Sequence, residues 1–160
     1  MAHAAARNAY GPRPCGCARS SGLGGFARLN RLQPTTYRAD ATADLPASST
    51  DVDITGATIT LTTQTNNAVY EARAYGDVDY GGASTALVRV KLLVDGAAQT
   101  SEALHQDGTA TASDRATAAQ EWRGTIPTAG SHTLKLNGTT GSASVLRATH
   151  TIITVTIYEV

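Results

Sequence analysis

Residues 145–160 read VLRATHTIITVTIYEV, and this stretch decides the fold class. β-Branched residues dominate it, and its apolar positions alternate instead of recurring every three or four residues as a helix requires. Two sets of side chains face opposite ways: Thr149, Thr151, Ile153, Val155 and Ile157 on one side, and His150, Ile152, Thr154, Thr156 and Tyr158 on the other. One set is nearly all aliphatic and the other is mixed. The stretch therefore predicts a central strand, over 146–158, with both faces partly covered.

The preceding sequence repeats this pattern at intervals of eight to twelve residues. Asp95-Gly96 is the strongest hairpin signal, because both residues tolerate the positive φ that a two-residue turn needs. Asn137-Gly138 and Gly141 predict a loop before the closing strand. The other predicted strands are 51–63 with a break at Gly56, 68–80 ended by Gly81-Gly82, two strands within 84–104, 116–126, and 131–136 after the turn at 127–130.

Seven or eight short strands separated by turn residues, without a helical segment, predict an all-β antiparallel sandwich with jelly-roll topology. The sandwich is expected over residues 36–160. Residues 1–35 are rich in Gly and Pro and carry scarcely any periodic apolar pattern. They predict an extended N-terminal arm instead of a folded domain.

Charge is divided unevenly between these two parts. Six Arg and no acidic residue precede Asp40, whereas 7 Lys or Arg and 13 Asp or Glu occupy the chain from Asp40 onward, which gives +6 and −6. A basic arm of this kind is typical of a segment that meets an acidic partner: nucleic acid, a membrane surface or the acidic body of another copy. The side chains expected to contact the partner are Arg7, Arg13, Arg19, Leu23, Phe26, Arg28, Leu29 and Arg31.

The sequence favours no catalytic or cofactor chemistry. No nucleophile elbow, triad order or Gly-rich phosphate loop is present, so we expect no enzyme and no cofactor. Cys15-x-Cys17 is too short a set for a four-ligand zinc site, and we expect two reduced thiols. The N-terminus lacks the apolar core of a signal peptide, and no run is long enough for a membrane helix. We expect assembly in a cytoplasm and no membrane partner.

Two polar or aromatic groups leave alternatives open. Residues 77–82, DVDYGG, resemble the beginning of a calcium loop, but Val88 stands where the bidentate Glu would be needed, so a solvated turn and no metal are predicted. Trp122, Tyr75 and Tyr80 are the candidates for stacking on a sugar, although the neighbours of Trp122 indicate a half-buried strand residue. The arm has few aromatic residues among its arginines, which disfavours a dedicated nucleic-acid binder.

Several segments resemble the small β-sandwich virion proteins of tailed bacteriophages, namely minor tail, fibre or head-decoration proteins. The matching segments are LPASSTDVDITGATITLTT (45–63), ALVRVKLLVDG (86–96), WRGTIPTAGSHTLKL (122–136) and THTIITVTIYEV (149–160). The resemblance covers about four-fifths of the chain and leaves the arm unmatched. It implies a jelly roll like those of the tumour-necrosis-factor and complement globular-head class, a trimer, a place in the virion and no catalytic residues.

The sequence thus supports two hypotheses. In the first, the protein is a non-enzymatic virion component that self-associates through its sandwich and attaches by its arm to capsid or tail proteins. In the second, it is a carbohydrate-binding or adhesive sandwich that recognises a host surface. In either case Ile153, Val155, Ile157 and Tyr158 are expected in the core or at a subunit interface.

Overall fold

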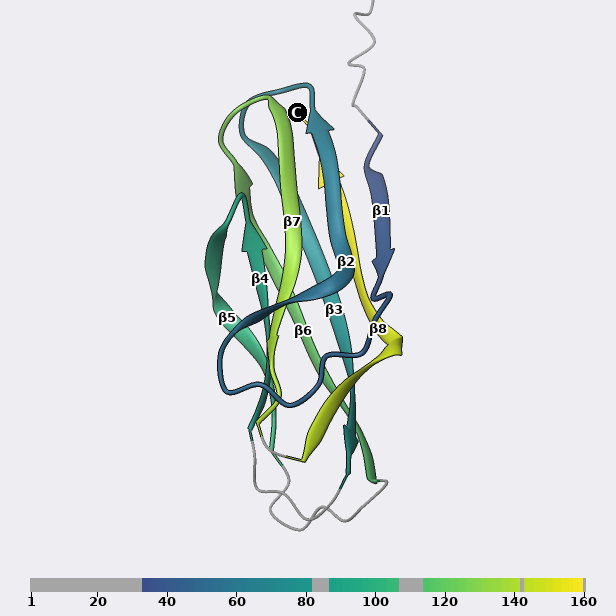
Figure 1. Cartoon of the computed structure of the whole chain (residues 1–160). Coiled ribbons are helices and arrows are strands. Elements are labelled where there is room, and N and C mark those ends of the chain that lie inside the picture. The colour runs from purple at the N-terminus through teal and green to yellow at the C-terminus, as the bar shows by residue number, and fades with distance from the viewer. Residues whose placement is uncertain (1–32, 82–86, 107–113, 142, 160) are drawn as a thin grey trace, which may run out of the picture. The chain divides into compact units, whose positions relative to one another are not determined.

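The computed structural model describes residues 33–81, 87–106, 114–141 and 143–159 of the chain. These residues form a β-sandwich without a helix (Figure 1). The strands are β1 (Thr35–Asp40), β2 (Val52–Thr63), β3 (Ala68–Tyr80), β4 (Val88–Val94), β5 (Ala97–His105), β6 (Asp114–Ile126), β7 (Gly130–Thr139) and β8 (Ser144–Tyr158).

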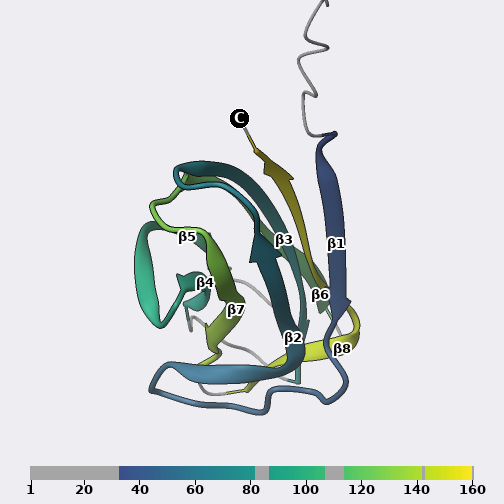
Figure 2. The same cartoon turned by 90° about the horizontal axis from the view of Figure 1, so that it is seen from above.

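The strands form two four-stranded sheets, in the orders β1-β8-β3-β6 and β2-β7-β4-β5. Every strand pair is antiparallel. The β4–β5 hairpin stays within one sheet. Every other connection between consecutive strands leads to the opposite sheet (Figure 2). This order is that of a jelly roll, so the predicted fold class is confirmed.

The core lies between the sheets and is made mostly of aliphatic and alanine side chains. Strand β3 shows how the sequence builds it, since Ala68, Tyr70, Ala72 and Ala74 are buried while the residues between them face outward. Tyr70 fits because the facing residue, Gly124, has no side chain: a Cβ there would lie 2.5 Å from the Tyr70 hydroxyl. Small alanines on a central strand thus leave room for a few large aromatic rings.

The hairpin between β4 and β5 confirms the turn prediction. Asp95 and Gly96 have φ of 50° and 83°, the left-handed conformation that a two-residue turn between antiparallel strands requires. The backbone N–H of Asp95 donates to the carbonyl of Thr133 at 2.8 Å. The turn is therefore fastened to the neighbouring strand β7.

Two predictions about strand limits were wrong. Strand β1 was not predicted, since TTYRAD follows Pro34 and offers only six residues of alternation. Asn137-Gly138 does not open a loop, because β7 continues through both residues and Gly138 pairs with Val52 and Val90. Gly138 is needed there for packing, as a Cβ would lie 2.7 Å from a methyl group of Leu45.

Strand β8 is central, as predicted, and lies between β1 and β3. Its alternation is broken once, by a bulge. Tyr75 of β3 pairs with Ile152, and Asp77 pairs with Arg147. Four residues of β8, 148–151, therefore lie opposite the single residue Gly76. In this bulge the Thr151 hydroxyl accepts from the N–H of Asp77 at 3.1 Å and donates to the carbonyl of Arg147 at 2.7 Å. Thr149 is consequently exposed, against the prediction that it shares the apolar face.

Candidate binding face

The outward-facing side of the sheet β1-β8-β3-β6, called here the β3 face, carries most of the large polar side chains of that sheet. The register of the strands arranges them in rows that cross the sheet. Glu71 and Arg123 form one row, Arg73 and Glu121 the next, and Ile152, Tyr75 and Ala119 a third, with Asp77, Asp79, Arg115 and Arg147 beyond them. Charged rows therefore flank an uncharged row.

Tyr75 is the most prominent side chain of the uncharged row. It is 45% exposed, although it lies near the middle of the central strand β3. Its neighbour on β6 is Ala119, which is too small to cover a phenol ring, and its neighbour on β8 is the half-buried Ile152. An aromatic ring is therefore presented to solvent with an apolar side chain beside it.

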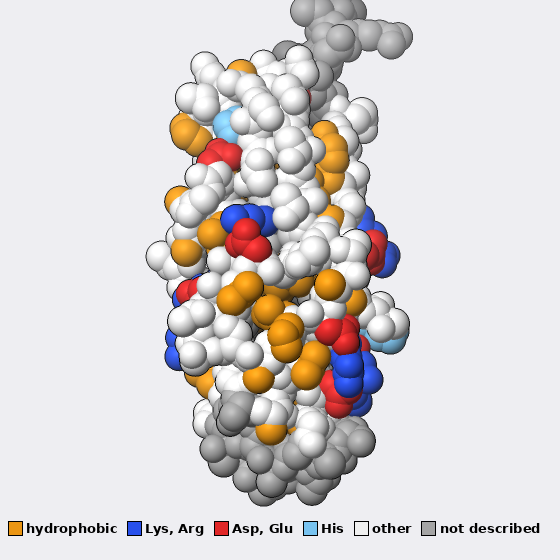
Figure 3. Space-filling view, in the orientation of Figure 1, with side chains coloured by type: hydrophobic (Ala, Val, Ile, Leu, Met, Phe, Trp, Pro, Cys, Tyr) orange, Lys and Arg blue, Asp and Glu red, His pale blue; other side chains and the backbone are white. Residues whose placement is uncertain are grey.

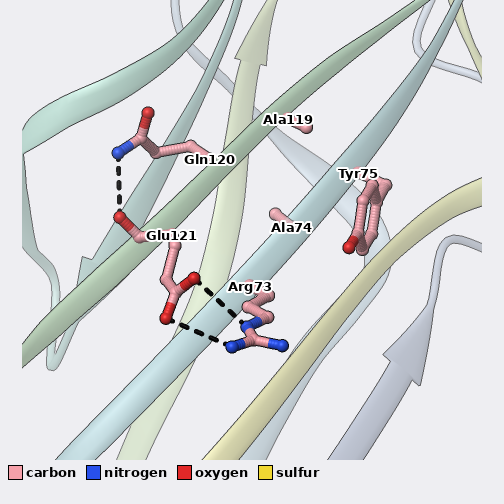
Figure 4. Close-up of a pocket in the computed structure, with 6 residues that line it drawn as sticks. All are labelled: Arg73, Ala74, Tyr75, Ala119, Gln120 and Glu121. Atoms are coloured by element: carbon pink, nitrogen blue, oxygen red, sulfur yellow. Dashed lines mark hydrogen bonds and ion pairs between the residues drawn. The ribbon is translucent and has the colours of Figure 1, made fainter.

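A shallow depression of about 460 Å³ lies on one side of Tyr75 (Figure 4). Arg73 and Glu121 line it, and the guanidinium Nε and Nη2 lie 3.3 and 3.4 Å from the two carboxylate oxygens. The pair is bidentate and exposed, so both side chains keep hydrogen-bonding capacity toward solvent.

A second depression, of about 570 Å³, lies on the other side of Tyr75. Asp77 is its innermost polar group, with a side chain only 12% exposed. The Asp77 carboxylate accepts two hydrogen bonds from Arg115, one of them from Nε at 3.2 Å, and lies 3.1 Å from Nδ1 of His150. Arg115 and His150 are thereby held at the rim of the depression together with Thr117 and Ile152.

Arg147 extends this polar cluster toward the segment between β1 and β2. Its guanidinium bonds Asp79 and Asp44, each at 2.7 Å. The pKa of Asp44 is lowered, because the Ala148 N–H and then the Arg147 guanidinium donate to its carboxylate. The bulge in β8 is thus locked to the loop that follows β1.

A third depression continues the β3 face toward the C-terminal end of β8. Glu71, Arg73, Thr154, Thr156 and Tyr158 line it. The Tyr158 hydroxyl donates to Glu71 at 3.0 Å, and this hydrogen bond to a carboxylate raises the pKa of the phenol. The third depression shares Arg73 with the first, which in turn shares Tyr75 with the second.

The residues predicted for the arm lie almost entirely outside the described part of the chain. This applies to all eight side chains expected to contact a partner, from Arg7 to Arg31. The sixth arginine before Asp40, Arg38, lies in β1 and bonds Asp40 at 2.6 Å. The segment before the described residues therefore holds five arginines and no acid.

The predicted residues of the closing strand divide between two environments. Ile153, Val155 and Ile157 are buried between the sheets, at 4% exposure or less. Tyr158 lies on the β3 face and is 36% exposed. The first three side chains thus belong to the core of one chain, and Tyr158 belongs to the surface.

The three aromatic candidates for stacking on a sugar also separate. Trp122 is buried in the core, where its indole N–H donates to the carbonyl of Ser101 at 2.7 Å, and Tyr80 is buried as well. Only Tyr75 is available at the surface. The sequence analysis did not predict Arg73, Glu121 or Arg115 as site residues. The register between β3 and β6 places them on one face of the sheet, so a correct prediction of that strand pair would have identified them.

The histidines and acidic motifs form no catalytic arrangement in the described residues. His132 uses both ring nitrogens structurally, with Nδ1 2.7 Å from Asp95 Oδ2 and Nε2 2.9 Å from the Thr128 carbonyl. Asp77 and Asp79 lie in β3 and bond arginines, so the prediction of a solvated turn was wrong.

The described residues also lack a metal-binding cluster and a membrane-spanning helix. No group of three or more His, Cys, Asp or Glu side chains there is placed to hold a metal ion. Nor does a helix with the length and apolarity needed to cross a membrane occur in the described part.

Comparison with known proteins assigns no family. No protein-family model matches the chain, and no curated protein matches it. Among solved structures, 79% of the chain aligns with dimeric latent PorU from Porphyromonas gingivalis at 10% identity and a TM-score of 0.44, but covers only 13% of that protein. It also aligns over 79% with the CBM36-1 domain of a xylanase from the hindgut metagenome of Trinervitermes trinervoides, covering 98% of that domain at 12% identity and a TM-score of 0.39. A third match, infectious bursal disease virus Gx strain, has 14% identity and a TM-score of 0.40, with 79% of this chain and 33% of that one covered. None of these similarities assigns an activity or a partner to this chain.

Proposed function

We propose that the protein is a non-enzymatic structural component of a tailed-bacteriophage virion, as a head-decoration, head-fibre or minor tail protein. In this proposal the β-sandwich self-associates, as a trimer, and the N-terminal arm attaches it to capsid or tail proteins. The trimer and the place in the virion are taken from the sequence resemblance described above. The proposal involves no cofactor and no membrane.

The division of charge is the observation that carries this proposal. Residues 1–32 hold five Arg without an acid, whereas residues 33–160 hold eight Lys or Arg against 13 Asp or Glu. Every Arg and Lys side chain in the described strands except Arg89 has a carboxylate partner within 4 Å. The strands therefore pair nearly all their own cations, and in this proposal the five arginines before them bind an acidic partner.

Sedimentation of virus particles tests the attachment. Full-length protein should co-sediment with its particle, and a variant lacking residues 1–32 should not, although it should melt cooperatively as a β-protein. Because the contacts of the arm are ionic, about 1 M salt, where the Debye length is roughly 3 Å, should also release the full-length protein. Co-sedimentation of the truncated variant, or attachment indifferent to salt, would overturn the role of the arm.

The exposed Tyr75 favours a second candidate function, recognition of a carbohydrate on a host surface. The two functions are compatible, since a protein anchored to a particle by its arm leaves its sandwich available for adhesion. Immobilised glycans probed with the full-length protein test this function. Absence of binding to every glycan would remove it without affecting the structural role.

A further inference from the structure

We infer that the β3 face binds a linear, uncharged oligosaccharide that lies along β3, with Tyr75 as its central stacking platform. The inference rests on the second candidate function and adds to it the site, the ligand class and the roles of the side chains. It starts from the three adjoining depressions described above.

The three depressions adjoin one another at shared side chains, and their combined extent sets the length of the ligand. Arg73 belongs to both the first and the third depression, and Tyr75 to both the first and the second. From Glu71 to Asp77 the track follows six residues of β3, which is about 20 Å at roughly 3.3 Å per residue. A single sugar ring is too short to reach both ends, so a chain of several sugars fits the track.

The side chains along the track supply the two kinds of contact that sugars need. Tyr75 offers an aromatic face for the C–H side of a sugar ring, and Ile152 extends that apolar surface. Bidentate pairs stand on both sides of Tyr75: Arg73 with Glu121 on one side and Arg115 with Asp77 on the other. Their planar groups can donate to and accept from neighbouring hydroxyl groups of a sugar.

The charge of the face disfavours a polyanion. The strands place five arginines and five carboxylates on it, namely Arg38, Arg73, Arg115, Arg123 and Arg147 with Asp40, Glu71, Asp77, Asp79 and Glu121. The face is therefore neutral and its arginines are already paired, whereas nucleic acids and acidic glycans require an excess of positive charge.

The same composition disfavours a protein partner. The centre of a stable protein interface is depleted of charged residues, and here charged rows lie on both sides of the uncharged row that holds Tyr75. The exposed large apolar side chains of the described residues are also scattered, since Val52 and Leu104 belong to the other sheet. An uncharged hydroxyl-rich chain remains the ligand that the face suits.

The test compares full-length wild type with two matched variants on an array of uncharged linear glycans of four or more sugars. Tyr75→Ala removes the platform, and Leu104→Ala removes an apolar side chain of comparable exposure, 53% against 45%, from the opposite sheet. Titration of the best glycan should show at least a tenfold weaker Kd for Tyr75→Ala and a change within twofold for Leu104→Ala. Raising the salt concentration to about 1 M should leave the wild-type Kd within twofold, since no ionic contact with the ligand is involved.

The outcomes separate the site from the function. Glycan binding that survives Tyr75→Ala would overturn the site while leaving carbohydrate recognition in place, and binding to no glycan would overturn both. Binding only to acidic glycans or DNA, lost in high salt, would overturn the ligand class. An altered sedimentation coefficient for Tyr75→Ala would show that the face is a contact between subunits and would also overturn the inference.

Discussion

The two outward faces of the sandwich differ in the size of the side chains they carry. On the sheet β2-β7-β4-β5, the part of the outward face where β2 pairs with the end of β7 nearest β6 carries short hydroxyl side chains: Thr60, Thr62, Ser131 and Thr133. Much of the upper part of this face is accordingly white in Figure 3, where neither charged nor hydrophobic side chains cover it. The β3 face instead carries arginines, carboxylates and Tyr75 along its central strands.

This difference shows how one fold can give its two sheets different surfaces. Threonine is suited to strands and, being short and β-branched, covers a sheet evenly. Long side chains on the β3 face leave depressions between them, and they fix their positions by ion pairs across the strands. The β3 face therefore combines depressions with side chains that ion pairs hold in place.

The largest effect is expected where strand β8 separates core from surface. Val155→Asp puts a carboxylate into a fully buried position and should cost several kcal/mol, enough to abolish cooperative melting. The adjacent Thr154→Asp is the matched control, because that side chain points to the β3 face between Arg38 and Arg73 and its replacement should change Tm by less than about 4 °C. Equal Tm values for the two variants, measured by circular dichroism, would contradict the assignment of the two sides of β8.

The next effect concerns the edge at which the two sheets meet through β5 and β6. Trp122→Phe should lower the free energy of unfolding by about 2 kcal/mol, since it leaves a cavity and removes the hydrogen bond to Ser101. Tyr70→Phe, which loses only the hydroxyl that donates to Gln99 at 2.9 Å, should cost about 1 kcal/mol. Urea unfolding measures both, and a larger loss for Tyr70→Phe would mean that packing of the indole contributes little to this edge.

The sequence predicted the layers of the fold better than their exact strand limits. β3 and the β4–β5 hairpin have simple alternation and strong turn residues, and both were found. β1 was missed because its six residues depend on pairing with β8. The continuation of β7 through Asn137-Gly138 was missed because Gly138 serves the packing of Leu45 and not a turn.

The candidate site was predictable only in part, for a related reason. Tyr75 was named from its residue type, but nothing local distinguishes it from the buried Tyr80 on the same strand. The two tyrosines differ in the side of the sheet they face. They are five positions apart, and an odd spacing along a strand places two side chains on opposite sides. The contact of His150 with Asp77 depends on the bulge in β8, which local alternation does not encode.

A smaller effect, dependent on pH, is expected at the edge of the β3 face. The pKa of Asp44 is lowered in the folded protein, so its ionised form stabilises the fold above the unfolded pKa of about 3.9, and this contribution is lost as pH falls through the folded value. Asp44→Asn should therefore lower the free energy of unfolding by about 1 kcal/mol or less at pH 7. The difference in stability between the variant and the wild type should be smaller at pH 3 than at pH 7, because the contribution of the ionised carboxyl falls with pH below the unfolded pKa. A constant difference between them in urea titrations at the two pH values would show that shape, not charge, holds this loop.

The smallest effect is expected for the exposed ion pair Arg73–Glu121 beside Tyr75, and comparing it with the pair Arg115–Asp77 can distinguish the two ends of the track. Arg73 and Glu121 are 59% and 55% exposed, so a double-mutant cycle with Met and Gln should give a coupling energy of about 0.3 kcal/mol. Asp77 is only 12% exposed and accepts from Arg115, so the corresponding cycle should give about 1–2 kcal/mol. High salt should remove the first coupling and leave most of the second, because water and ions reach only the exposed pair freely.

The groups near His150 would then be rigid and those near Glu121 adjustable. This predicts that the Asp77 end of the track selects the ligand and the Arg73 end accommodates it. Equal coupling energies at the two ends would contradict that division.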